Sequence, residues 1–388
     1  MERELEQLTS EFVARFSSTP RFFQAPGRVN LIGEHTDYNE GFVLPFAIDR
    51  KTIVASARRD DTQLNVYARD LDESATIELS DPATLRRGNW IDYVEGIARC
   101  SAERFGVSLR GADIIIASNV PIGAGLSSSA AIEIAVGHAL LSLNDVAIER
   151  IELAFAGQQT EHKFVGTRSG IMDQFASVFG KKANAMLLDC RSLEIEQVPV
   201  TYPDIALAVI DTKVKHNLAS SEYNTRRAEC EAGVEVLQKK IPGLASLRDA
   251  TTEMLNDYGG MLSEVVRRRC YHVVSENIRT EAAAEAFRRK HFVLAGKLMK
   301  ESHKSLRDDY EVSCAELDFL VDTATVIDGV YGARMTGGGF GGCTVNLVET
   351  RAVENLRERS VKKYSEQFGF APDFYIFHPA DGASEITA

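Results

Sequence analysis

The fold of this chain is decided by residues 121–131, which have the sequence PIGAGLSSSAA. The apolar run at residues 114–116, three isoleucines, predicts a buried strand before this stretch. After it, apolar residues recur at helical spacing from Ile132 to Leu143, which predicts a helix that starts at the serines. A strand, a glycine-rich turn and a helix therefore follow one another here.

A glycine-rich turn that leads into a helix is typical of an anion-binding site. Gly123 and Gly125 allow the backbone to approach a ligand closely. The first N–H groups of the helix lack helical partners and lie at the positive end of its dipole. The three serine hydroxyls offer further donors, or a ligand to a hard cation such as Mg²⁺. The alternative is an ordinary loop that ends in a serine N-cap, because serine is a common cap.

Composition and charge restrict the class of protein. The chain of 388 residues is long enough for two domains, and its net charge of −12 argues against a general nucleic-acid or membrane-surface binder. The six cysteines form no C-x-x-C pair, which suits neither a zinc cluster nor a small disulfide scaffold. The charged N-terminal stretch has no apolar signal core, and no segment approaches the ~20 apolar residues of a membrane span. We therefore expect a cytoplasmic protein without nucleic-acid or membrane partners.

A second polar cluster lies near the N-terminus. Residues 27–38 have the sequence GRVNLIGEHTDY, in which Glu34, His35 and Asp37 fall within four positions. Apolar segments on both sides hold this cluster between buried parts of the chain, and loops held in this way often carry ligand contacts. Two carboxylates and an imidazole can hold several sugar hydroxyls by directed hydrogen bonds. The alternative is a solvated turn.

Two further carboxylates are candidates for chemistry. Asp173 lies between apolar neighbours at the start of a short predicted helix, where it is either favoured by the helix dipole or a partly buried catalytic group. Glu161 lies near the end of a predicted helix over 151–164 and is alternatively a solvated carboxylate. Trp90 and Tyr93 open another helix, where they either stack on a nucleotide base or pack in the core.

The glycine-rich residues 337–342 contain a literal G-x-G-x-x-G pattern. A dinucleotide site requires a helix directly after this pattern, whereas a strand is predicted over 343–348. A turn that passes close to another segment or to a ligand is the better interpretation. Neither a Walker-type motif nor the protein-kinase signatures occur in the sequence.

The chain is expected to form two units. An amphipathic helix over 2–16 opens a first unit, 1–200, and a strong strand over 205–210 opens a second unit, 201–388. Long helices are expected in the second unit, one of them opening at Ser221. The last eight residues are predicted to be a frayed tail.

Three separated segments together resemble one known family, the GHMP kinases of sugars and small metabolites. Residues 121–130 match the phosphate motif of this family, and residues 334–342 look like its glycine-rich third motif. Residues 27–38 are similar, almost letter for letter, to the signature of the members that phosphorylate galactose. With residues 170–174 and 222–224, the resemblance spans nearly the whole chain.

The resemblance implies a fold and a reaction. The fold is α+β, with two domains, mixed and antiparallel sheets, and the active site in the cleft between the domains. The reaction transfers the γ-phosphoryl group of ATP to the anomeric hydroxyl of α-D-galactose, with Mg²⁺ as cofactor, in the Leloir pathway. The expected partners are galactose and ATP, and a monomer is expected. Two alternatives stay open: a kinase for N-acetylgalactosamine or galacturonate, and a non-catalytic galactose and ATP sensor.

The resemblance also implies roles for single residues. Asp173 is the implied base near the anomeric hydroxyl, and Arg28 is implied to steer it and stabilise the transition state. Alternatively, both residues mainly position and polarise the hydroxyl while the proton leaves late. Ser129 and Glu161 are the implied Mg²⁺ ligands. The implied sugar contacts are Glu34, His35, Thr36, Asp37, Gly170 and Tyr223. The implied phosphate-binding residues are Gly123, Ala124, Gly125, Leu126, Ser127, Ser128 and Ser129.

Overall fold

The computed structural model describes residues 2–81, 86–214 and 219–386. The helices are α1 (Glu2–Phe16), α2 (Ile91–Phe105), α3 (Ser128–Leu143), α4 (Arg150–Thr160), α5 (Met172–Phe179), α6 (Ala219–Leu237), α7 (Thr252–Tyr258), α8 (Glu264–Arg288), α9 (Phe292–Asp308), α10 (Ala315–Thr325) and α11 (Val353–Phe368). The strands are β1 (Arg21–Asn30), β2 (Phe42–Val43), β3 (Pro45–Arg58), β4 (Gln63–Ala68), β5 (Glu73–Glu78), β6 (Ala112–Ser118), β7 (Asn184–Asp189), β8 (Ile195–Pro199), β9 (Ile205–Asp211), β10 (Val330–Thr336), β11 (Cys343–Glu349), β12 (Asp373–Ile376) and β13 (Ser384–Ile386).

The N-terminal part of the chain is built on a six-stranded sheet with the order β13-β1-β3-β6-β4-β5. It is a mixed sheet, because β4 and β6 are parallel and the other pairs are antiparallel. Strand β6 is buried on both faces: Ile114 and Ile116 belong to the core under α2 to α5, whereas Ile115 packs with Leu8 and Phe12 of α1. Burial on both faces explains the unbroken apolar run in the sequence.

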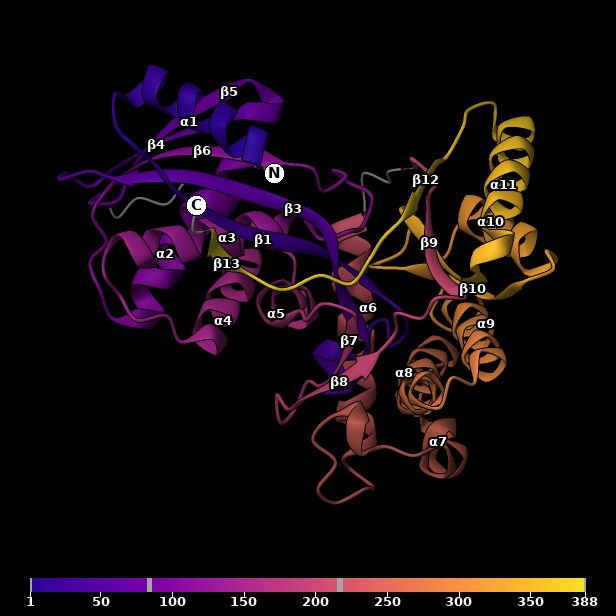
Figure 1. Ribbon diagram of the computed structural model, residues 1–388. Helices are drawn as coiled ribbons and strands as arrows, with labels where there is room; N and C mark the ends of the chain where they lie inside the picture. Colours follow the sequence, from indigo (N-terminus) through magenta and orange to yellow (C-terminus); the bar gives the residue numbers. More distant parts are fainter. Residues whose placement is uncertain (1, 82–85, 215–218, 387–388) are drawn as a thin grey trace.

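The C-terminal part carries an antiparallel four-stranded sheet with the order β10-β11-β9-β12. Ala208 and Ile210 of β9 pack toward α10 and α11, and Leu207 and Val209 pack in the cluster that contains residues of α8 and α9. Figure 1 shows this sheet and its helices on one side of the molecule and the β1-β3-β6 sheet on the other. A small third sheet, β2-β7-β8, lies between α8 and the N-terminal sheet. The expected α+β fold with mixed and antiparallel sheets is therefore confirmed.

Strand β1 continues through Pro26 and Gly27, with a register shift between Pro26 and Arg28 in its pairing with β3. One local prediction was wrong. The tail over residues 381–388 was expected to be frayed, but Ser384–Ile386 forms β13 and pairs with β1. Figure 1 shows the end of the chain crossing back, in yellow, to the N-terminal sheet. The division at residue 200 remains a prediction. Because β13 pairs with β1, residues 384–386 belong to the sheet of the first unit, although they follow residue 200 in the chain.

Strand β13 should contribute measurably to stability. Three of its residues pair with β1, Ser384 accepts a hydrogen bond from Gln24, and the Glu385 carboxylate accepts two from Arg21. Deletion of residues 384–388 should lower the free energy of unfolding by about 1–3 kcal/mol, because each hydrogen bond contributes a net ~0.5–1.5 kcal/mol. Urea unfolding measures this change.

The matched control is Glu385→Gln, which removes only an ion pair whose side chains are partly exposed, at 45% for Arg21 and 34% for Glu385. Such pairs contribute roughly 0–1 kcal/mol, so this variant should stay close to the full chain. A truncated chain that unfolds at the same urea concentration as the full chain would show that β13 adds nothing.

Candidate functional site

The predicted phosphate loop lies between β6 and α3. Gly123 and Gly125 have φ angles of 76° and 74°, in the left-handed region that favours glycine, and α3 begins at Ser128 as predicted. The turn after β10 packs directly against this loop, since a Cβ atom on Gly337 would lie 3.1 Å from the carbonyl oxygen of Gly125. The glycine-rich run is therefore a turn that passes close to another segment, as the sequence predicted.

Two cavities meet at one ion pair. The larger, about 720 Å³, extends over the phosphate loop and is lined by Gly123, Gly125, Leu126, Ser127, Ser128 and Ser129, among others. The smaller, about 140 Å³, is lined by Glu34, His35, Asp37, Glu161, Gly170 and Tyr223, among others. Arg28, Asp173 and Gly338 line both cavities. A molecule in the larger cavity therefore lies next to a molecule in the smaller one.

Arg28 and Asp173 form a two-pronged ion pair at this junction. Arg28 Nε donates to Asp173 Oδ1, and Nη2 donates to Oδ2, both at 2.9 Å. Arg28 Nη1 also donates to the carbonyl oxygen of Gly125 at 2.6 Å, and the Ser127 hydroxyl lies 2.5 Å from Asp173 Oδ2. The guanidinium is almost fully buried, with 6% of the side chain exposed, whereas 28% of the Asp173 side chain is exposed. The carboxylate is thus fixed in position and still accessible from the cavities.

The smaller cavity is lined by polar groups from distant parts of the chain. Glu34 and His35 are buried, and Asp37 faces Gly170, where no side chain fits because a Cβ atom would overlap the Asp37 carboxylate. The His35 ring lies near that of Tyr223, with ring centroids 5.3 Å apart. These groups offer hydrogen-bond acceptors and donors around a small space, which suits a small polyhydroxylated molecule.

Burial and crowding of charge shift the ionisation of these groups. Burial, with a contribution from the charge of Asp173, raises the pKa of Asp37 to about 6. Burial and the neighbouring His272 hold the pKa of His35 well below its usual value, so the imidazole is neutral at pH 7. Burial also raises the pKa of Glu34, against the opposing charge of Arg334. Perturbed titratable groups of this kind gather at functional sites.

Ser129, at the start of α3, and Glu161, directly after α4, form a pair that fits a hard cation. Burial raises the pKa of Glu161 to about 7, a hydrogen bond from Ser129 opposes this shift, and the charge of Asp173 adds to it. Glu133, one turn along α3, is fully buried, and its Oε1 has no hydrogen-bond partner among the described residues. Excess negative charge in a buried place favours a nearby cation. Ser129 and Glu161 therefore have the chemistry of Mg²⁺ ligands.

The two aromatic candidates lie at the larger cavity. Trp90 and Tyr93 both line it, together with the apolar side chains of Leu71 and Ile122. Trp90 is also partly buried against the hydrophobic core, and its indole N–H donates to Glu73 at 2.5 Å. Trp90 thus packs on the core and also faces the cavity, whereas Tyr93 is partly buried and faces the cavity.

The structure brings together all the predicted site residues except two. Thr36 is fully buried and lines neither cavity. Its hydroxyl lies 2.9 Å from the carbonyl oxygen of Gly33 and 2.6 Å from that of Phe42, and these contacts stabilise the loop. Ala124 is buried in the core behind the phosphate loop. Neither residue lines a cavity, and their assignment to ligand contact stays a prediction. Sequence reasoning missed Leu71, which carries no distinctive local pattern, and it assigned no role to Ile122 and Gly338, although both lie in motifs that it singled out.

The comparisons with known proteins agree with this geometry. The model of the GHMP kinases N terminal domain matches residues 92–181, and that of the GHMP kinases C terminal matches residues 283–366. The Methanococcus jannaschii mevalonate kinase, at 18% identity and a TM-score of 0.63, shares the fold over 94% of this chain and 99% of its own. The fold and the paired cavities define a small-molecule kinase of the GHMP class.

Closer relatives identify the branch of this class. The model of the galactokinase galactose-binding signature matches residues 10–58. Galactokinase from Roseiflexus sp. (strain RS-1) is 44% identical and covers 98% of this chain and 97% of its own; that from Chloroflexus aggregans is 45% identical over 94% of each. Lactococcus lactis galactokinase complexed with galactose has a TM-score of 0.94 at 36% identity, and covers 98% of this chain and 100% of its own. The chain belongs to the galactokinase family.

Asp37→Asn should stabilise the protein above pH 6. Because the pKa of Asp37 is raised from 3.8 to about 6, the folded chain keeps a proton between these values that the unfolded chain has lost. Wild-type stability therefore falls as the pH rises through this window, and the variant should lack this fall. We expect a gain on the order of 1–2 kcal/mol at pH 8, smaller than full linkage because the carboxylate is partly exposed.

Urea unfolding between pH 4 and 8 measures this effect. Asp60→Asn, at a side chain that is 97% exposed, controls for the general removal of one carboxylate. Parallel stability profiles of the wild type and of Asp37→Asn would contradict the expectation.

Proposed function

We propose that this chain transfers the γ-phosphoryl group of ATP to the anomeric hydroxyl of α-D-galactose, giving α-D-galactose 1-phosphate and ADP in galactose metabolism. The observation that carries the proposal is the Arg28–Asp173 ion pair, which lines both cavities at once. A phosphoryl donor in one cavity and an acceptor hydroxyl in the other would meet there. The galactokinase names of the relatives specify the substrates.

The larger cavity suits ATP. Its floor combines the phosphate loop with the N-terminus of α3, whose N–H groups and dipole favour phosphate oxygens. Leu71, Trp90 and Ile122 line the same cavity and offer an apolar surface for the base. We therefore assign the triphosphate to the loop at 123–129 and keep base stacking on Trp90 or Tyr93 as a hypothesis.

The smaller cavity suits the sugar. Glu34, His35, Asp37 and Tyr223 offer directed hydrogen bonds, and backbone at Gly170 comes close enough to restrict the shape of the pocket. A site of this kind rejects a sugar that lacks a matching hydroxyl, because a buried polar group then stays unpaired. We assign these five residues to galactose.

Phosphoryl transfer depends on in-line placement of the two oxygens and on charge neutralisation more than on covalent help. We assign Asp173 to the anomeric hydroxyl, where its carboxylate accepts the hydrogen bond and then the proton as the new O–P bond forms and the bond to ADP breaks. Arg28 holds this carboxylate with two hydrogen bonds and adds positive charge where the phosphoryl group arrives. The alternative, in which both residues mainly orient and polarise the hydroxyl, uses the same contacts.

Mg²⁺ is the cofactor we propose, held by Ser129 and Glu161. When bound, such an ion neutralises phosphate charge and orients the transferred group. The described part of the chain contains no grouping of three or more His, Cys, Asp or Glu side chains with metal-binding geometry. Few protein ligands suit Mg²⁺, which usually takes its other ligands from phosphate and water.

The remaining properties we propose are a cytoplasmic location and a monomeric state. None of the six cysteines, all of which are described, is in a disulfide, which suits a reducing compartment. In the described ranges 2–81, 86–214 and 219–386, no helix has both the length and the apolar character that a membrane span requires.

The proposal predicts Mg-ATP-dependent ADP release with galactose and little with other sugars. Galactose, glucose, N-acetylgalactosamine and galacturonate are assayed in parallel, with sugar 1-phosphate as the second product to quantify. Strong turnover with only one of the other sugars would support kinase activity but contradict galactose as the substrate. Binding of galactose and ATP without ADP formation would contradict the proposed reaction and favour the alternative function as a non-catalytic sensor.

Asp173→Asn should lose most of the turnover and still bind ATP. The amide keeps the shape of the side chain and a hydrogen-bond acceptor but no longer takes the proton, and base catalysis typically contributes about 10²–10⁴-fold. Galactose-dependent ADP release measures turnover, and calorimetry measures ATP binding. Near-normal turnover would contradict the base role and favour the alternative in which the residue orients the hydroxyl.

A further inference from the structure

A fully buried arginine lies behind the sugar pocket and outside both cavities. Arg334 of β10 is the largest side chain with no exposed surface, and its Nη2 lies 3.5 Å from Oε1 of Glu34. Its Nη1 donates to the carbonyl oxygen of Asn30 at 3.3 Å. Nε and Nη2 have no hydrogen-bond partner among the described residues. A guanidinium in such a place needs a carboxylate nearby, because an unpaired buried charge is strongly unfavourable.

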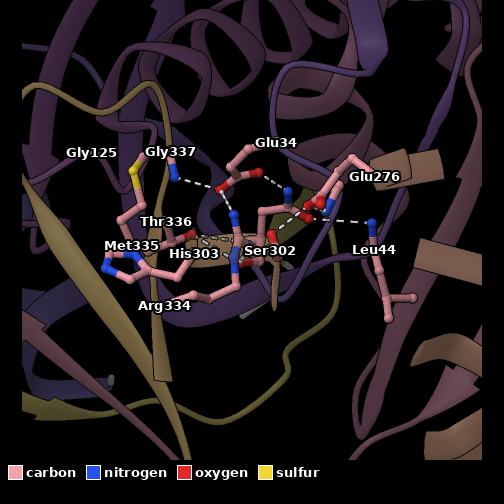
Figure 2. A network of polar contacts seen from close by, with 12 residues as sticks. Glu34, Leu44, Gly125, Glu276, Ser302, His303, Arg334, Met335, Thr336 and Gly337 are labelled. Atoms are coloured by element: carbon pink, nitrogen blue, oxygen red, sulfur yellow. Dashed lines mark hydrogen bonds and ion pairs between the residues drawn. The ribbon is translucent and has the colours of Figure 1, made fainter. Parts of the chain in front are cut away.

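Glu34 receives contacts on both carboxylate oxygens. Oε1 accepts a hydrogen bond from the Gly337 N–H at 2.6 Å and faces Arg334, and Oε2 accepts one from the Asn30 side-chain amide. Figure 2 shows the Arg334 guanidinium directed at this carboxylate, with the Gly337 N–H directed at the same oxygen. Asn30 is itself held by Thr336, whose hydroxyl lies 2.9 Å from the Asn30 carbonyl oxygen. The segment 334–337 therefore holds the Glu34 carboxylate in place, directly and through Asn30.

A second carboxylate shares the positive charge of Arg334. Glu276 of α8 accepts hydrogen bonds from the Ser302 hydroxyl at 2.5 Å and the Gly33 N–H at 3.0 Å. Its burial acts to raise its pKa, but Arg279, His272 and Arg334 together lower the pKa to about 2. Figure 2 shows Glu276 and Ser302 beside the Arg334–Glu34 pair. Arg334 thus lies in a network that links the loop containing Gly33 and Glu34 with α8 and α9.

We infer that Arg334 is a positioning residue for galactose binding, which keeps Glu34 ionised and oriented toward the sugar pocket without touching the sugar. Glu34 is almost completely buried, so water contributes little to stabilising its charge. An ionised carboxylate accepts hydrogen bonds from sugar hydroxyls, whereas a protonated one gives up part of this capacity. The inference rests on the proposed function, since it assigns Glu34 to the sugar.

The test is a double-mutant cycle with Arg334→Met and Glu34→Gln. Arg334→Met should raise the KM for galactose roughly 10–100-fold, which is the scale of a hydrogen bond to a charged group. The KM for Mg-ATP should change less than about twofold, because Arg334 lines neither cavity. In the Glu34→Gln background, Arg334→Met should have no further effect on the KM for galactose, because it acts through Glu34.

Thermal unfolding of the same four proteins adds an independent measurement. Each single variant leaves one buried charge without its partner and should unfold at a lower temperature than the wild type. The double variant removes both charges and should unfold at a higher temperature than Glu34→Gln alone. Arg334→Lys keeps the positive charge, and should raise the KM for galactose less than Arg334→Met does.

Arg269→Met is the matched control. Arg269 is nearly as buried and is ion-paired, with Glu229 at 2.8 Å and Glu311 at 2.6 Å, and it lines neither cavity. Its loss should lower the unfolding temperature and leave the KM for galactose within about twofold, because it lies outside the sugar pocket.

Additive effects of Arg334→Met and Glu34→Gln on the KM for galactose would overturn the positioning role, as would an unchanged KM in Arg334→Met. Equal rises in the KM for both substrates would overturn it too, because they indicate a general structural defect. Absence of galactose turnover by the wild-type chain would overturn the proposed function, and the positioning role with it. The two failures are thus distinguished by the wild-type measurement.

Discussion

The ion pair between Arg28 and Asp173 is the constraint on which the arrangement of this molecule depends. Arg28 comes from β1, Asp173 from α5, and the Gly125 carbonyl that Arg28 also binds comes from the phosphate loop. Two charges with limited access to water are stable only when they are paired with good geometry. The pair therefore fixes a strand, a helix and a loop relative to one another, and does so at the junction of the two cavities.

Negative charge accumulates around this junction, at a cost in stability. Asp37, Glu133 and Glu161 all have raised pKa values, for which burial is the largest cause in each case. Buried carboxyl groups of this kind are common at functional sites. They lower the stability of the folded chain when no cation or polar ligand is bound. Binding of a cation and of hydrogen-bond donors from a substrate would favour the charged form of these buried carboxyl groups.

The C-terminal part of the chain completes both cavities. The turn after β10 packs on the phosphate loop through Gly337, and Gly338 lines both cavities. Glu34 accepts a hydrogen bond from the Gly337 N–H and faces Arg334. One short segment therefore contacts the walls of both cavities. A shift of the C-terminal sheet would change both together.

The local elements and many of the residues that line the cavities were predictable from the sequence. The strand, glycine turn and helix around residues 114–143 were predictable, because apolar periodicity, glycine and a helix start are all features of neighbouring residues. The motif at residues 27–38 was recognisable for the same reason, and it supplied Glu34, His35 and Asp37. Three features became visible in the fold alone: Thr36 turns inward, β13 returns to β1, and Arg334 faces Glu34. These outcomes depend on contacts between residues far apart in the chain, which leave no periodic pattern in the sequence around either partner.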